Sequence, residues 1–166
     1  MELLVIIIVL ALVFDYINGF HDAANSIATI VSTKVLTPFQ AVIWAAFFNF
    51  VAFFIAKYVI GGFGIANTVS KTVIEEFISL PIILSGVIAA IAWNLFTWWK
   101  GIPSSSSHTL IGGFAGAAIM AHGFDAIQVS IILKIAAFIF LAPLIGMAIA
   151  FGFTLLVLNI SKKAHP

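Results

Sequence analysis

The chain of 166 residues is 63% hydrophobic and 8% charged, and its mean hydropathy is +1.25. This composition predicts an all-α integral membrane protein, because at about 20 residues per crossing the length allows roughly four to six helices and leaves no room for a soluble enzyme domain. A formal net charge of +1 argues against a nucleic-acid groove, and the lack of cysteine excludes disulfides and cysteine-ligated metals.

The first predicted element is a helix that begins in an apolar run, residues 3–14, and turns apolar again before Thr33. Between these parts lie six polar or small residues: Asp15, Asn18, Gly19, His21, Asp22 and Asn25. Ionised groups are costly in lipid, so we expect this cluster to face protein or water. The pattern predicts a first helix that is broken near Gly19.

Two further crossings are predicted in the middle of the chain, at residues 38–60 and 80–99. Residues 65–78 separate them and hold a lysine and two glutamates, which indicates a polar surface loop with a short amphipathic helix. The third crossing ends in tryptophans and a lysine, as is typical near a membrane interface.

The C-terminal part begins with a glycine-rich segment, residues 109–121, that is too short for a full crossing. Its length predicts the half-helix of a re-entrant helical hairpin. The apolar stretch 127–160 is either one long kinked helix or two shorter helices, because Pro143 lies near its middle. A polar tail, residues 161–166, completes a single transmembrane domain over residues 1–166.

The first polar cluster, residues 18–25 (NGFHDAAN), is rich in groups that hold small cations. Asp22 brings a charge, and Asn18 and Asn25 bring amide oxygens beside a glycine that permits an unwound backbone. Alternatively, Asp22 and Asn25 only cap the second half of a broken helix. His21 is either a proton carrier near neutral pH or a structural hydrogen-bond donor.

The second polar cluster, residues 103–109 (PSSSSHT), comes directly before the predicted half-helix. Proline suits a helix N-terminus, where the serine hydroxyls meet free backbone N–H groups and the positive end of the helix dipole. The cluster therefore predicts a site for a tetrahedral oxyanion. The alternative is an interfacial loop with a serine N-cap.

The predicted crossings contain three further polar residues that stand alone. Asn49 and Asn94 are typical of amides that make a hydrogen bond between two membrane helices. Asp15 either lines the same path as Asp22 or lies near the membrane interface, and both positions stay open.

With both clusters in view, the sequence resembles the inorganic phosphate transporter (PiT) family. The family signatures are G-x-[NH]-D-x-[AT]-N on a broken first helix and P-x-S-[ST]-[ST]-H at a hairpin, and here they read GFHDAAN at residues 19–25 and PSSSSH at residues 103–108. The flanking residues look like the N-terminal half of a bacterial low-affinity transporter. The resemblance implies a secondary active transporter for inorganic phosphate, and not an enzyme. It further implies transport by alternating access in the cytoplasmic membrane of a prokaryote.

The resemblance also implies roles for individual residues. Phosphate binding falls to five hydroxyls: Ser104, Ser105, Ser106, Ser107 and Thr109. Coupling-ion binding or organisation of the site falls to Asp22, Asn25, His21, Asn18 and His108. The coupling ion is H⁺ or Na⁺, with Na⁺ expected at Asp22 and Asn25 if sodium is used, and no other cofactor is implied. His21 stands where sodium-coupled members typically have asparagine, which favours proton coupling and metal-phosphate uptake, and sulfate-carrying relatives also exist.

Family members generally contain two inverted halves that each carry both motifs, whereas this chain has one copy of each. The resemblance therefore implies one half of an inverted-repeat transporter, with the site between the halves near the bilayer midplane. We expect the chain to pair with an identical copy, as a homodimer or larger assembly, or with a separate second half, unless it is a fragment.

Two functions of other classes are alternatives. An intramembrane serine hydrolase would need Ser104 and His108 to meet as residues i and i+4 of a helix. The chain lacks a G-x-S-x-G elbow and offers four interchangeable serines, which argues against this function. The other alternative is a non-transporting half that only completes the fold of a partner.

Overall fold

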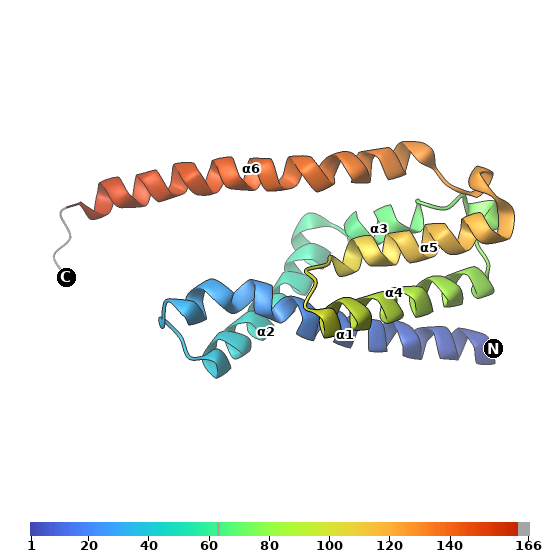
Figure 1. Ribbon diagram of the computed structural model, residues 1–166, viewed down its shortest axis with the longest axis horizontal. Helices are drawn as coiled ribbons and strands as arrows, with labels where there is room; N and C mark the ends of the chain where they lie inside the picture. The colour runs from blue at the N-terminus through green and yellow to red at the C-terminus, as the bar shows by residue number, and fades with distance from the viewer. Residues whose placement is uncertain (63, 163–166) are drawn as a thin grey trace. The chain divides into compact units, whose positions relative to one another are not determined.

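The structure is a computed structural model that describes residues 1–62 and 64–162 (Figure 1). The regular elements within these ranges are helices: α1 (Glu2–Ser32), α2 (Pro38–Ile55) continued by a π-helix η1 (Ala56–Ile60), α3 (Gly64–Ser70), η2 (Glu75–Phe77), α4 (Leu80–Lys100), α5 (Ser106–His122), η3 (Phe124–Ala126) and α6 (Val129–Ser161). The elements up to η3 belong to one compact unit, and α6 belongs to a second. Each unit is described by itself.

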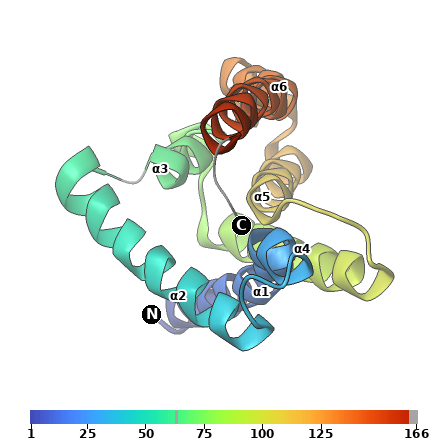
Figure 2. The same cartoon turned by 90° about the vertical axis from the view of Figure 1, so that its left-hand side faces the viewer.

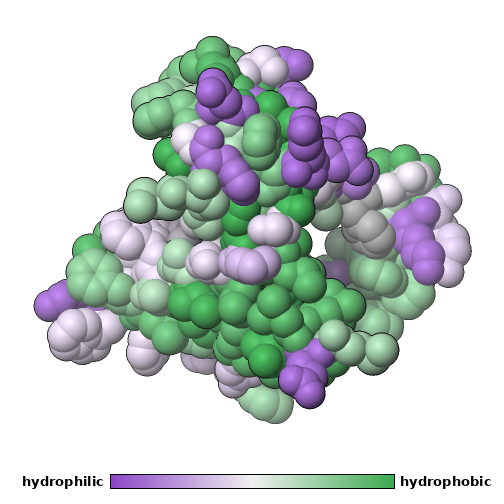
Figure 3. Space-filling model, turned by 90° about the vertical axis from the view of Figure 1, so that its right-hand side faces the viewer, coloured by the Kyte–Doolittle hydropathy of each residue, from purple (hydrophilic) through white to green (hydrophobic). Residues whose placement is uncertain are grey.

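Within the described ranges, four helical segments are long and apolar enough to cross a membrane: α1, α2 with η1, α4 and α6. Large apolar side chains such as Phe39, Phe140 and Phe151 are exposed on them, and hydrophobic residues cover much of the face shown in Figure 3. In water such a surface would be unfavourable, whereas lipid tails or further membrane helices would cover it. The prediction of an all-α membrane protein is confirmed.

The helix α1 is continuous from Glu2 to Ser32, so the predicted break near Gly19 is wrong. The Ser26 hydroxyl donates to the carbonyl oxygen of Asp22 at 3.1 Å, which is a contact typical of regular helix. A continuous helix satisfies its own backbone groups, whereas an unwound turn would need other partners at the same place. The capping alternative for Asp22 and Asn25 fails with the break, because both residues lie inside the helix.

The helix α2 begins at Pro38, the first residue of the predicted crossing 38–60. Thr37 is the N-cap: its hydroxyl accepts a hydrogen bond from the Gln40 backbone N–H, while the Gln40 side chain accepts one from the Thr37 backbone N–H. Pro38 occupies the first turn, where its missing N–H costs nothing. Both predicted middle crossings, 38–60 and 80–99, are confirmed as helices.

The helices α4 and α5 form an antiparallel hairpin that dominates the packing of the first unit (Figures 1 and 2). Their backbones touch at two glycines. A Cβ on Gly113 would lie 2.6 Å from the Gly86 carbonyl oxygen, and one on Gly86 would lie 2.9 Å from the Cα of Phe114. The helix α5 has 17 residues, or about 25 Å, which is shorter than the roughly 30 Å hydrocarbon core. The hairpin is therefore present with a short second arm, and its re-entry into the membrane stays a prediction.

The segment 65–78 is only partly a surface loop. Thr72 and Val73 are buried, and Val73 belongs to the apolar core together with Ile82 and Phe114. The backbone of this segment also pairs with residues after α5, since the Gln128 N–H donates to the Thr72 carbonyl oxygen at 2.9 Å. Burial of an apolar side chain and pairing of its backbone explain why this polar-looking stretch packs against the hairpin.

The second unit contains the single helix α6, with Pro143 inside it. One long helix, and not two shorter ones, is therefore correct for the stretch 127–160. The predicted polar tail 161–166 begins at the end of α6, and its residues 163–166 lie outside the described residues.

The glycine contact predicts that α5 does not tolerate a side chain at position 113. Gly113→Ala should lower the free energy of unfolding by about 1–3 kcal/mol, because the methyl group must push the two backbones apart. Gly116→Ala is the matched control on the same helix: nothing lies within 4 Å of its Cβ position. It should be neutral or stabilising by about 0.5–1 kcal/mol. Thermal unfolding in detergent measures both, and equal behaviour of the two variants would contradict the close approach.

Candidate functional site

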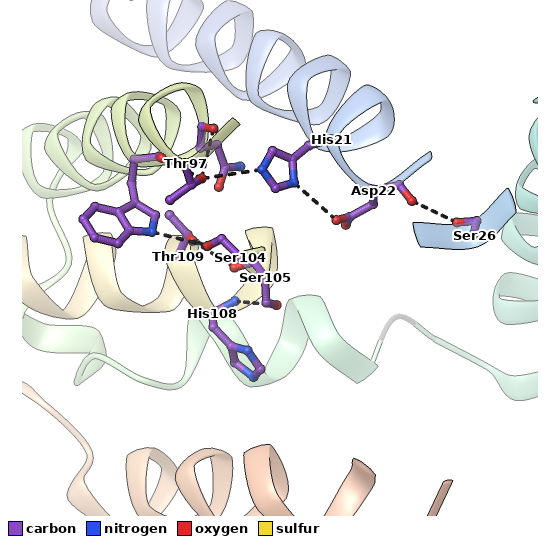
Figure 4. A network of polar contacts seen from close by, with 10 residues as sticks. His21, Asp22, Ser26, Thr97, Ser104, Ser105, His108 and Thr109 are labelled. Carbon is purple, nitrogen blue, oxygen red and sulfur yellow. Dashed lines mark hydrogen bonds and ion pairs between the residues drawn. The ribbon is translucent and has the colours of Figure 1, made fainter. Parts of the chain in front are cut away.

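The four serines before and at the start of α5 are not equivalent. Ser105 is the N-cap, and its hydroxyl accepts a hydrogen bond from the His108 backbone N–H at 3.4 Å. Ser104 precedes the helix and lies 3.4 Å from the Thr109 hydroxyl, while the Trp93 indole N–H donates to it at 3.3 Å (Figure 4). The side chains of Ser104 and Ser105 are therefore held by the protein, whereas Ser106 and Ser107 make no side-chain hydrogen bond within the described part of the chain.

Ser106 and Ser107 occupy the first turn of α5. The Ser106 side chain is 2% exposed, and its hydroxyl has no hydrogen-bond partner among the described residues. Ser107 is exposed. Both line a cavity of about 490 Å³, and Asn18 of α1 lines the same cavity. One residue of the first polar cluster and two of the second thus share a cavity at a helix N-terminus, where the dipole favours an anion.

His21 connects α1 to α4. Its Nε2 lies 3.5 Å from the Thr97 hydroxyl, and its Nδ1 lies 3.6 Å from a carboxylate oxygen of Asp22 (Figure 4). The second distance is too long for a hydrogen bond but suits an ion pair when the imidazole is protonated. The His21 side chain is only 7% exposed, whereas that of Asp22 is 45% exposed. His21 is thus a buried residue of α1 that contacts α4 through Thr97. Its Nδ1 has no hydrogen-bond partner among the described residues.

Other predicted site residues lie outside these contacts. Asn25 is exposed, and its side chain has no hydrogen bond among the described residues. His108 is exposed too, and its ring points away from Ser104 and Thr109 (Figure 4). Because Ser104 precedes α5, Ser104 and His108 do not occupy positions i and i+4 of one helix, so the geometry required for the hydrolase alternative is wrong. Among the described residues no three His, Asp or Glu side chains form a metal cluster.

Asn94 of α4 is a residue that sequence reasoning did not assign to the site. Its side chain is fully buried, and neither the oxygen nor the nitrogen of its amide has a hydrogen-bond partner in the described parts of the chain. The hydrogen bond between helices that was predicted for Asn94 is therefore missing. An unpartnered buried amide is costly, and such a group in a native fold calls for a ligand, a water or an ion.

The hairpin register places Asn94 level with Ser106. Gly86 lies against Phe114, and the helices are antiparallel. Asn94 comes eight residues after Gly86, and Ser106 comes eight residues before Phe114, so equal helical rise brings them to the same height. Thr97, one turn along from Asn94, contacts His21. The buried side chains that have polar atoms without a partner in the described structure are therefore His21 of α1, Asn94 of α4 and Ser106 of α5. Only the register, which the sequence alone does not reveal, points to Asn94.

The unpartnered amide predicts an unusual response of stability to mutation. Asn94→Leu keeps the branched shape and removes two polar atoms that have no partner, so the free energy of unfolding should stay unchanged or rise by about 1–3 kcal/mol. Thr97→Val is the matched comparison, because its hydroxyl donates to the carbonyl oxygens of Trp93 and Asn94. It should cost about 1 kcal/mol. If Asn94→Leu lowered the free energy of unfolding more than Thr97→Val did, the finding that the Asn94 amide has no partner would be contradicted.

The chain is similar to known proteins over both polar clusters. The family model described as "Phosphate transporter family" matches residues 18–166. The chain is 49% identical to a probable low-affinity inorganic phosphate transporter of Rhizobium meliloti over 93% of this chain and 45% of the relative. It is 44% identical to one of Bacillus subtilis over 98% and 48%, and 33% identical to low-affinity inorganic phosphate transporter PitB of Escherichia coli over 93% and 33%.

No solved structure matches the chain. The chain spans about half the length of the Rhizobium meliloti and Bacillus subtilis relatives. The match to the family model covers most of the sequence and includes both polar clusters. The chain therefore belongs to the phosphate transporter family.

Proposed function

We propose that this chain carries inorganic phosphate across a membrane as part of a secondary active transporter. The observation that carries the proposal is the start of α5, where the buried, unpartnered Ser106 hydroxyl and the exposed Ser107 line one cavity. Family membership supports the substrate, and the relatives above are named as low-affinity inorganic phosphate transporters. We assign phosphate to Ser104, Ser105, Ser106, Ser107 and Thr109, with Ser106 and Ser107 as the direct donors.

The chemistry of this helix end suits transport better than tight storage. Hydroxyls and backbone N–H groups donate hydrogen bonds, and the helix dipole adds a partial positive charge, yet no lysine lines the cavity among the described residues. The anion is therefore recognised without a full countercharge from the site. Such a site binds the anion and also releases it, as alternating access requires.

Coupling to a cation is assigned to the α1 side of the site. Asp22 carries a charge, and the neighbouring His21 lies between Asp22 and Thr97, where a proton on the imidazole would link α1 to α4. Asn25 shares the Asp22 face of the continuous helix, so an Na⁺ ion held by these two residues is the other option. We also assign Asn18 and His108 to the organisation of the site. Asn18 lines the cavity, and the His108 backbone N–H donates a hydrogen bond to the Ser105 hydroxyl.

The working form is proposed to contain a second half. The chain spans about half of two relatives that it matches, and it carries each motif once. An identical copy or a separate second half would supply the other side of the site, in a homodimer or a larger assembly. The membrane is proposed to be the cytoplasmic membrane of a prokaryote, as the bacterial relatives suggest.

The enzyme alternative is not supported. The family is a transporter family, and Ser104 is engaged by Trp93 and Thr109 and not by a histidine. A serine nucleophile needs a base within hydrogen-bond reach, and among the described residues none is in contact with these serine hydroxyls.

The role of Ser106 can be tested by uptake of radiolabelled phosphate into proteoliposomes. Ser106→Ala should lower uptake about tenfold or more, because it removes one hydrogen bond to a charged substrate. Ser79→Ala is the matched control, since Ser79 is exposed and its side chain makes no hydrogen bond in the described structure. Equal uptake by wild type and Ser106→Ala would overturn this assignment, and an excess of sulfate as competitor tests the choice between the two oxyanions.

The choice of ion gradient across the membrane distinguishes H⁺ from Na⁺ as the coupling ion. With His21 as the proton carrier, a pH gradient without Na⁺ should drive uptake, and His21→Asn should abolish this response while the protein stays folded. Measurements in the same proteoliposomes with either gradient decide the question. Uptake driven only by Na⁺ would show that His21 is structural.

A further inference from the structure

Asn94 is a buried polar residue of α4 to which the function proposed above gives no role. Its side chain is fully buried, and neither atom of its amide has a hydrogen-bond partner in the described parts of the chain. Its polar neighbours on α4 are both engaged. The Trp93 indole donates to Ser104, and the Thr97 hydroxyl donates to two backbone carbonyl oxygens. A buried amide is costly unless a bound group satisfies it, so Asn94 is a candidate for contact with the substrate.

Asn94 lies on the face of α4 that lines the cavity at the start of α5. Ile83 and Val87 of α4 both line this cavity. Asn94 comes seven residues after Val87, and seven residues are close to two turns of helix, so the two side chains share one face. The hairpin register places Asn94 level with Ser106. The cavity-facing row of α4 therefore ends in an amide at the height of the first turn of α5.

A second contact places α1 at the same level. The Thr97 hydroxyl lies 3.5 Å from His21 Nε2, and α1 and α4 run in the same direction (Figure 1). Asn18 precedes His21 by three residues, and Asn94 precedes Thr97 by three residues, so equal helical rise brings the two amides to one height. Asn18 is only half-buried, which lets water satisfy its amide, whereas Asn94 is closed to water.

Hydrogen-bond chemistry makes Asn94 different from the serines. Hydroxyl and backbone N–H groups donate to any oxyanion, so Ser106 and Ser107 accept phosphate and sulfate alike. The Asn94 amide pairs a donor, Nδ2, with an oxygen, Oδ1, that only accepts. At neutral pH phosphate keeps at least one P–OH group, whereas sulfate carries no proton. Phosphate can therefore satisfy both amide atoms, while sulfate leaves Oδ1 buried without a donor.

We propose that Asn94 selects phosphate over sulfate by reading the proton on the anion. Its Oδ1 accepts the hydrogen of the P–OH group, and its Nδ2 donates to a second oxygen of the anion that Ser106 holds. This inference rests on the proposed phosphate function and adds a specificity-determining residue to it. Burial is essential to the selection, because water cannot replace the missing donor when sulfate enters.

The test is displacement of radiolabelled phosphate from the full chain purified in detergent, at neutral pH, by unlabelled phosphate, arsenate or sulfate. Arsenate is larger than phosphate but also keeps a hydroxyl at this pH. For the wild type, phosphate and arsenate should both displace the label at concentrations about tenfold or more below those needed for sulfate. In Asn94→Leu the affinities for phosphate and arsenate should fall about tenfold while that for sulfate stays unchanged, so the preference disappears.

Two further variants sharpen this test. Asn49→Leu is the matched control, because it makes the same chemical change at an exposed amide of α2 that has no hydrogen bond in the described structure. It should keep the preference for phosphate. Asn94→Ser covers the case in which Asn94→Leu fails to fold. A serine hydroxyl donates to sulfate as readily as it accepts from phosphate, so this variant should lose the preference too.

The outcomes separate this inference from the proposed function. Variants at Asn94 that keep the preference, or that lower the affinities for all three anions equally, would overturn the role of Asn94 and leave phosphate transport standing. A wild type that binds sulfate as tightly as phosphate would have the same meaning. A wild type that binds no phosphate would overturn the proposed function and this inference with it.

Discussion

The backbones of α4 and α5 meet at Gly86 and Gly113, where a Cβ on either residue would lie within 3 Å of the other helix. This contact sets the register of the hairpin, because helices that touch backbone to backbone cannot slide without a clash. The register in turn brings the Trp93 indole to Ser104 and places Asn94 level with Ser106. The polar end of the hairpin is therefore positioned by packing at its apolar middle.

Backbone hydrogen bonding explains the shape of α1. In lipid each unsatisfied N–H or C=O group costs several kcal/mol, so a helix that stays continuous through its polar cluster needs no help from neighbours. The side chains then carry the polarity: His21 reaches Thr97 on α4, and Asn18 reaches the cavity.

Charge distinguishes the two sides of the candidate site. The α5 side offers hydroxyls and a helix dipole, both neutral or partly positive, while the α1 side offers carboxylates and amides. The two sides of the unit therefore differ in the sign of the charge that they favour, which is the electrostatic reason for the proposed coupling of an anion to a cation. Among the described residues, His21, Asn94 and Ser106 have buried polar atoms without a hydrogen-bond partner, and such atoms in native folds are usually satisfied by protein, water or a ligand.

Composition and motif order were enough to predict much of this protein. Hydrophobic content predicted an all-α membrane protein and the crossing that begins at Pro38, and the pair of polar clusters predicted the family. These features depend on local sequence, since hydropathy, turn chemistry and caps act within a few residues. The site residues assigned from the motifs remain predictions.

Contacts between distant residues were beyond the reach of the sequence. The contact of Ser104 with Trp93, the burial of Ser106 and Asn94 and the place of Asn18 in the cavity all depend on how helices pack. Periodicity shows which residues share a face of one helix, but the register between two helices is set by their contact surfaces. For this chain that register comes from two glycines, and it decides which side chains of α4 lie level with the serines at the start of α5.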